Sequence, residues 1–322
     1  MDPLLINEIQ KIKWFIRKEY KSNDTIRKIG FKQKQDMEET KDLLKSLFLN
    51  SINQVIRDIR ELFSKVDEEP LTFTFILNTK RLIRAQEEEL KEAVYNDIIS
   101  LVQSHGCHAR EYEIESYVHQ SLIVNIEGHN RSFESKTSGS DYGLVVDIPQ
   151  IDIDEMSVKS SYNGILIQAK RNALEDKIYD RYRELSNPDF DFSHVRNFFS
   201  LGLYKFENHN EHPRLSDFFF VPLESIEGNN QKFVKDVNCI LRGDGCQEFL
   251  DAESFYSKFI NGEIGITDGA KIKKYFYDNK KELPSLELRI YFEDGGDRLI
   301  SLIRNTNSVN PNTFIQAERS RG

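Results

Sequence analysis

The stretch from residue 138 to residue 170 decides the fold, and it reads SGSDYGLVVDIPQIDIDEMSVKSSYNGILIQAK. It contains two apolar runs, Asp141–Ile148 and Gly164–Lys170, which are predicted to be consecutive strands. The acidic, polar segment 151–163 between them is predicted to be a loop. Two strands joined by one connection can bring residues from both together, so the polar residues on these strands are the first candidates for a site.

Gln168 and Lys170 lie two positions apart at the end of the second run. Because side chains alternate between the two faces of a strand, both are predicted to point to the same face, opposite Ala169. A lysine in so apolar a strand needs a reason. Either the strand ends there and the lysine reaches water, or the lysine takes part in chemistry.

Asp141 is surrounded by small residues, because Ser138-Gly139-Ser140 precedes it and Gly143 follows two positions later. Glycine permits unusual backbone geometry and the close approach of a ligand. The alternative is an ordinary turn in which the carboxylate accepts a local hydrogen bond.

Asp141, Gln168 and Lys170 together favour a divalent-metal site. Mg²⁺ prefers oxygen ligands and keeps several waters, so a carboxylate, an amide carbonyl and one more carboxylate from a nearby helix would suffice. A bound metal ion polarises a phosphoryl oxygen and lowers the pKa of its water. A neighbouring lysine can orient that water and offset developing charge.

These residues carry a family resemblance. The SGSDYG turn followed by ILIQAKR is similar to the PD-(D/E)XK, or restriction-endonuclease-like, nuclease superfamily, with the lysine motif in its QxK form. The predicted order helix-strand-strand-strand-helix-strand over about residues 107–223 resembles the core of that family. The resemblance implies an α/β fold with a central mixed sheet flanked by helices. Helical residues 1–78 would precede a core of residues 79–235, and an α+β extension of residues 236–322 would follow.

The resemblance also implies roles for individual residues. Asp141 would be the central metal ligand, Gln168 the second ligand through its carbonyl, and Lys170 the catalytic lysine. A glutamate of the first core helix would complete the site, and Glu115 is the first choice, with Glu113 and Glu111 as competitors. Asp147 is a rival metal ligand. Three basic residues would contact nucleic acid: Arg171, Lys177 and Arg181.

The implied function is a metal-dependent endonuclease that uses Mg²⁺ or Mn²⁺. The family resemblance favours DNA as the substrate. The residues of the site would suit RNA equally well. Such nucleases serve microbial defence against phage, commonly beside a helicase or ATPase partner. A second reading is an inactive nuclease fold kept as a nucleic-acid-binding or scaffolding subunit, which Gln168 in place of an acid favours. In a third, the resemblance is a coincidence in a structural protein.

Periodicity predicts the remaining elements. Strands are expected at 71–77, 131–136 and 217–223, the last of them central in the sheet. Helices are expected at 34–66, from Asn78-Thr79 to 104, and at 113–127, 173–185 and 251–261, with Asp251 as the cap of the last. LELRIYF and RLISLIR around EDGGD predict a hairpin over 286–304.

Composition sets limits on the class of protein. The net charge of −9 argues against a sequence-independent nucleic-acid coat, so nucleic-acid binding would depend on local basic patches. Three cysteines argue against a disulfide framework. The N-terminus does not resemble a signal peptide, and no apolar run approaches the length of a membrane helix. A cytoplasmic protein with no membrane association is therefore expected.

Overall fold

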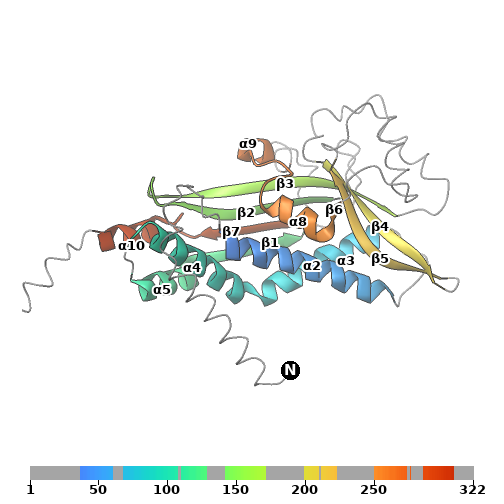
Figure 1. Ribbon diagram of the computed structural model, residues 1–322, viewed down its shortest axis with the longest axis horizontal. Coiled ribbons are helices and arrows are strands. Elements are labelled where there is room, and N and C mark those ends of the chain that lie inside the picture. Colours follow the sequence, from blue (N-terminus) through green and yellow to red (C-terminus); the bar gives the residue numbers. More distant parts are fainter. Residues whose placement is uncertain are drawn as a thin grey trace, which may run out of the picture. The chain divides into compact units, whose positions relative to one another are not determined.

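The computed structural model shows a mixed α/β fold in which helices pack against a mixed β-sheet (Figure 1). It describes residues 37–60, 68–107, 110–128, 142–171, 199–209, 212–222, 250–273, 276 and 286–307. The predicted strand 131–136 and helix 173–185 lie outside these residues, as do the first 36 residues.

One sheet runs through the described residues in the order β1-β7-β2-β3-β4-β5-β6. The pairs β2–β7 and β3–β4 are parallel and the others are antiparallel, which makes the sheet mixed. The strands are β1 Leu122–Gly128, β2 Tyr142–Asp152, β3 Ser157–Arg171, β4 Phe199–His209, β5 His212–Pro222, β6 Leu250–Asp251 and β7 Leu286–Phe292.

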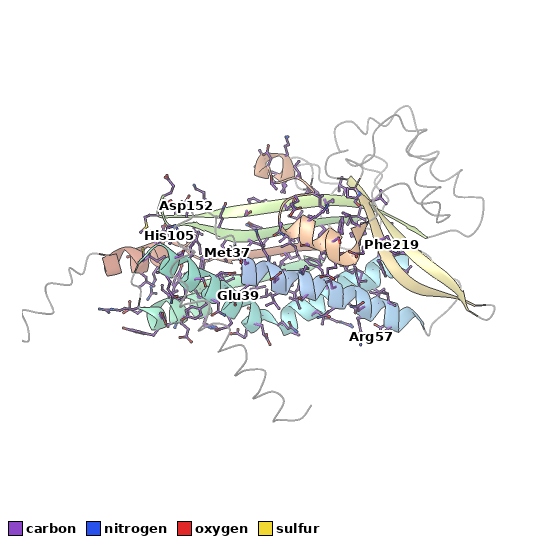
Figure 2. All side chains as sticks on the ribbon, viewed as in Figure 1. Met37, Glu39, Arg57, His105, Asp152 and Phe219 are labelled. Carbon is purple, nitrogen blue, oxygen red and sulfur yellow. The ribbon has the colours of Figure 1, made fainter. Side chains whose placement is uncertain are left out.

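The two strands predicted at 141–148 and 164–170 are confirmed as β2 and β3, but they are longer than expected. They pair without a break from Tyr142↔Ile167 to Asp152↔Ser157. The predicted loop 151–163 is therefore wrong, since only a short turn separates the strands. Polar residues fit this end of the hairpin because several of them, such as Lys159 and Ser160, are exposed to solvent. Asp152 marks that end in Figure 2.

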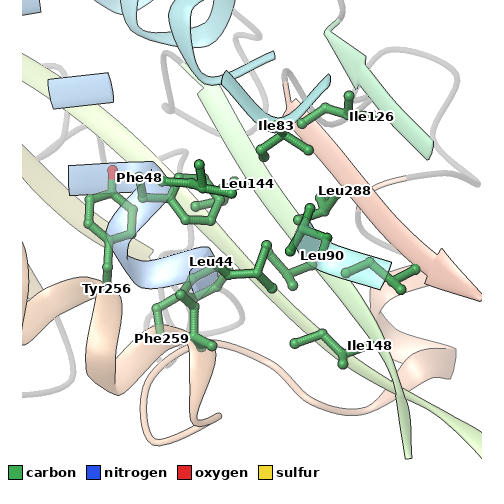
Figure 3. Packing of buried hydrophobic residues seen from close by; sticks show 14 of the residues in the cluster. Leu44, Phe48, Ile83, Leu90, Ile126, Leu144, Ile148, Tyr256, Phe259 and Leu288 are labelled. Atoms are coloured by element: carbon green, nitrogen blue, oxygen red, sulfur yellow. The ribbon is translucent and has the colours of Figure 1, made fainter. Parts of the chain in front are cut away.

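The helices pack against one apolar face of the sheet. Leu44 and Phe48 from the first described helix meet Leu144 of β2 and Leu288 of β7 in the core (Figure 3). The helices are α2 Glu38–Arg60, α3 Glu68–Ala85, α4 Glu87–Ser104, α5 Glu111–Ser121, α8 Ala252–Ile260, α9 Gly269–Ile272 and α10 Asp297–Asn307. Figure 1 shows α2, α3, α4 and α5 together on one side of the sheet, with α9 on the other.

The predicted strand 71–77 is wrong, because this segment belongs to α3. Its alternating apolar residues fit a strand locally, but Leu71, Phe75, Thr79 and Ile83 are buried at a spacing of four, which is a helix face. Pro70 lies in the first turn, where a helix tolerates proline. Asn78 and Thr79 consequently lie inside α3 rather than capping the next helix, which begins at Glu87.

Two other boundaries also differ from expectation. The predicted helix 113–127 ends at Ser121, and Leu122 begins β1. The predicted hairpin 286–304 is a strand followed by α10, because the Asp294 carboxylate accepts hydrogen bonds from the backbone N–H groups of Gly296 and Arg298 and so starts a helix.

The strand predicted at 217–223 is confirmed as the second half of β5, but it is not central. Among the described strands, only the two-residue β6 lies beyond β5 in the sheet. The predicted helix 251–261 is confirmed as α8, and the Asp251 side chain caps it by accepting from the backbone N–H of Ser254.

A buried carboxylate fixes the start of α2. Asp97 of α4 accepts hydrogen bonds from the backbone N–H groups of Glu39 and Thr40 at 3.0 and 2.9 Å and from the Thr40 hydroxyl at 2.7 Å. Figure 2 labels Glu39 at this end of α2. The side chain of a different helix thus satisfies N–H groups that have no partner within α2 itself. This contact fixes the packing of α2 on α4.

We expect Asp97→Ala to lower the free energy of unfolding by about 2 kcal/mol or more, since two buried donors and one partly buried donor lose a charged acceptor. Chemical denaturation of the full chain measures the change. Asp42→Ala removes an exposed carboxylate from the same helix, and this control should stay within about 0.5 kcal/mol of wild type. Equal losses in the two variants would contradict the capping role of Asp97.

Candidate functional site

Gln168 and Lys170 lie near the end of β3, in the interior of the sheet. Their backbones pair with Leu201 and Leu203 of the parallel strand β4. Ala169 between them is completely buried. The QxK sequence therefore belongs to a strand that pairs with β4 along these positions, and β3 ends one residue later at Arg171.

Asp141 lies outside the described residues, but the residue after it is well placed. Tyr142 is the first residue of β2, and it pairs with Ile167, the residue before Gln168. The sheet thus brings the sequence neighbours of Asp141 and Gln168 together. Lys177 and Arg181 also lie outside the described residues, and only the backbone of Arg171 is described.

The structure does not bring Glu115 to this end of the sheet. Glu115 belongs to α5, which leads directly into β1 at Leu122. Leu122 pairs with Phe292, whereas Leu286, at the other end of β7, pairs with Leu144. Six strand residues span about 20 Å, so α5 joins the sheet at the end remote from Gln168.

The glutamates of α5 interact with α4 and with their own helix rather than with the QxK end of the sheet. Glu115, Glu111 and Glu92 raise the pKa of Tyr95 in α4, although burial of the Tyr95 hydroxyl raises it more. Glu113 is engaged by Arg110, whose guanidinium lies 2.9 Å away and holds the pKa of Glu113 below its ordinary value. The assignment of a metal-binding glutamate to α5 therefore has no support from the geometry.

Gly143 has a structural reason to be glycine. A Cβ atom there would lie 3.0 Å from the Phe276 ring, and a Cβ at Gly164 on the neighbouring strand would also lie 3.0 Å from it. Phe276 is completely buried. The two glycines thus make room for one aromatic ring on this face of the β2–β3 hairpin.

Asp147, the rival ligand, lies farther along β2 and pairs with Tyr162. Tyr162 is six residues from Gln168 on β3, which is about 20 Å of strand. Asp147 therefore does not share a site with the QxK sequence. Its Oδ2 lies 3.5 Å from the Arg289 Nε of β7, and within the described chain its Oδ1 has no hydrogen-bond partner.

Asp147 has no exposed surface, and this burial raises the pKa of its carboxyl above the ordinary value. The Arg289 guanidinium, and to a smaller extent the hydroxyls of Ser160 and Tyr162, pull the pKa back down. Glu287 is a second carboxylate near Arg289, with its Oε1 3.9 Å from the Nε. One guanidinium thus lies close to two carboxylates on the face of the sheet opposite the main helical layer.

Sequence reasoning identified neither Arg289 nor Phe276. Arg289 pairs with a residue 142 positions away, and no local pattern reveals such a partner. The alternation of LELRIYF does place Arg289 on the face opposite its leucines, which is the one local signal. For Phe276, the only indication was a glycine in each of two adjacent strands.

The described residues show neither a metal-binding cluster nor a membrane-spanning helix. Within the described residues, no group of three His, Cys, Asp or Glu side chains could hold a metal ion. No helix in the described parts of the chain is long and apolar enough to cross a membrane. Comparison with protein-family models, with curated proteins and with solved structures finds no match.

Asp147→Asn should flatten the pH dependence of stability. Because the folded-state pKa of Asp147 is raised, its contribution to the free energy of unfolding is greatest below the ordinary carboxyl pKa. That contribution falls as the pH rises through the raised value. Denaturation of both proteins from acid to neutral pH measures this. The variant should gain stability relative to wild type as the pH rises, and parallel curves would disprove the burial effect.

We expect Gly143→Ala to cost about 1–3 kcal/mol of stability, because the new methyl group presses on the buried Phe276 ring. Gly269→Ala is the control, since its Cβ would meet the Tyr162 ring at an ordinary 3.4 Å. In a double-mutant cycle, Phe276→Leu should relieve part of the Gly143→Ala cost. Strictly additive losses would show that the ring and the glycine do not interact.

Proposed function

We propose that this chain is a metal-dependent nuclease with a restriction-endonuclease-like core, in which Asp141, Gln168 and Lys170 form the active site. The observation that carries the proposal is the pairing of Tyr142 with Ile167. Taken one residue further, the same register would place Asp141 opposite Gln168. Strand alternation then gives Asp141, Gln168 and Lys170 a common face.

The order of the elements supports the same proposal. A hairpin, β2 and β3, is followed after an undescribed connection by β4, which is parallel to β3. The QxK resemblance implies the order helix-strand-strand-strand-helix-strand. The elements α5, β1, β2, β3 and β4 follow it, and the second helix, predicted at 173–185, lies outside the described residues. The chain departs from the prediction in that β1 begins within the predicted helix 113–127, β4 lies where no strand was predicted, and β7 lies between β1 and β2.

The donor set fits a hard divalent cation in part. The Asp141 carboxylate and the Gln168 amide carbonyl are the oxygen ligands that Mg²⁺ or Mn²⁺ accepts, and waters can fill the other positions. When bound, the ion would supply Lewis acidity and lower the pKa of a water. Neither Glu115 nor Asp147 joins this set, because Asp147 is about 20 Å along the strands from Gln168 and α5 meets the sheet at the end remote from Gln168.

Lys170 would act on the reacting phosphodiester itself. Its ammonium can orient the attacking water and offset the negative charge that develops on the phosphoryl oxygens. Gln168 contributes no charge, so the site holds its metal ion more weakly than one with a second carboxylate. Such a site requires a higher metal concentration for activity than a site with two carboxylates, and a metal titration measures the difference.

The test is cleavage of supercoiled plasmid, linear duplex, single-stranded DNA and RNA with Mg²⁺ or Mn²⁺. We expect metal-dependent cutting by wild type and a loss of about a hundredfold or more in Lys170→Ala and Asp141→Ala, the scale of losing one transition-state contact. Gln168→Glu should cut at lower metal concentration, because it restores a charged ligand.

Two controls make the test specific. Lys159→Ala removes an exposed lysine from the other end of β3, and Glu115→Ala removes the glutamate of α5. Both should cut like wild type. If no substrate is cut by wild type or by Gln168→Glu at any metal concentration, the nuclease proposal fails and the scaffolding reading replaces it.

A further inference from the structure

The segment from Gly265 to Phe276, here named the α9 segment, is anchored on the face of the sheet that carries Gly143 and Gly164. Ile266 exchanges backbone hydrogen bonds with Gly164 of β3 at 3.0 and 2.8 Å. Two of its side chains, Ile272 and Phe276, are almost completely buried. The α9 segment is thus held at both ends against the β2–β3 hairpin, and α9 is visible on that side in Figure 1.

Between these anchors the α9 segment exposes positive charge. Lys271 and Lys273 flank the buried Ile272, and both are exposed. Within the described parts of the chain, neither side chain forms an ion pair or hydrogen bond. The sequence around them is basic and aromatic, since residues 268–281 read DGAKIKKYFYDNKK. This is a concentrated positive stretch in a chain whose net charge is −9.

The Phe276 end of the α9 segment approaches the proposed active site, whereas its Gly269 end packs on Tyr162, about 20 Å along β3 from the QxK sequence. The Phe276 ring packs on Gly143, and Gly143 pairs with Leu166. Residue 168 is the next position on that face of β3, about 7 Å farther along, and the extended register of the proposed site would put residue 141 opposite it. The exposed lysines are therefore carried by an element that abuts the QxK strand.

We propose that the α9 segment binds the phosphate backbone of the nucleic acid that the site cleaves, with Lys271 and Lys273 as the contacting residues; this inference rests on the proposed nuclease function. An acidic protein repels a polyanion except where a local patch reverses the potential. Lysines contact phosphates without reading sequence, and each contact releases condensed counterions.

The test is binding, measured separately from cleavage. Fluorescence anisotropy with labelled duplex DNA, single-stranded DNA and RNA is recorded across a salt series in EDTA, with wild type and Lys271→Ala/Lys273→Ala. We expect the variant to bind more weakly and its slope of log affinity against log salt to fall by about 2, one unit for each lost phosphate contact.

Arg81→Ala/Arg84→Ala removes two exposed charges from α3, on the helical side of the sheet, and is the matched control. This control should bind like wild type. The inference is overturned if the lysine variant binds like wild type, if the control loses as much affinity, or if wild type binds no nucleic acid. Binding that depends on the lysines without any cleavage would refute the nuclease alone, and cleavage with unchanged binding would refute only the role of α9.

Discussion

The insertion of β7 between β1 and β2 is the constraint on which the rest of the sheet depends. β7 pairs with β1 along its whole length and with β2 over four residues. Its inward side chains, Leu286, Leu288, Ile290 and Phe292, are all buried. Without β7, β1 would lose its only partner among the described strands, and the apolar face against which α3 and α4 pack would be divided. Residues near the C-terminus thus complete a sheet that begins before residue 130, which makes the pairing strongly non-local.

The two faces of the sheet carry different kinds of side chain. One face is apolar and is covered by α2, α3 and α4, whose side chains form a continuous core with β2, β3 and β7. The other carries Asp147 and Arg289 in its middle and Phe276 over the two glycines. Burying a carboxylate with one unpaired oxygen costs stability, and Arg289 offsets only part of that cost for Asp147. Such features concentrate at functional places, although Asp147 is remote from the QxK sequence.

A nuclease on an acidic chain must solve an electrostatic problem. Metal ligands are anionic and attract cations, while the same charges repel the substrate. The arrangement proposed for this chain separates the two tasks, with the metal ligands on the hairpin and the phosphate contacts on the α9 segment. In this proposed arrangement, the neutral Gln168 would reduce the repulsion at the cost of weaker metal binding. Because the aromatic ring of Phe276 ties the α9 segment to Gly143, both tasks depend on the same small area of packing.

The sequence by itself determined the β2 and β3 strands, the helices at α2 and α8, and the placement of Gln168 and Lys170 on one strand, because local periodicity and caps encode these features. It did not determine whether 71–77 is helix or strand, since a short alternating run satisfies both periods and only burial of Leu71, Phe75 and Ile83 at one helix face decides. It did not locate Glu115, because helix-to-sheet distances follow from strand register rather than from spacing along the chain. The insertion of β7, the Asp147–Arg289 pair and the anchoring of Phe276 were decided by the tertiary structure alone. Each joins residues more than 100 positions apart, and such contacts are selected by shape and burial over the whole core rather than by any local pattern.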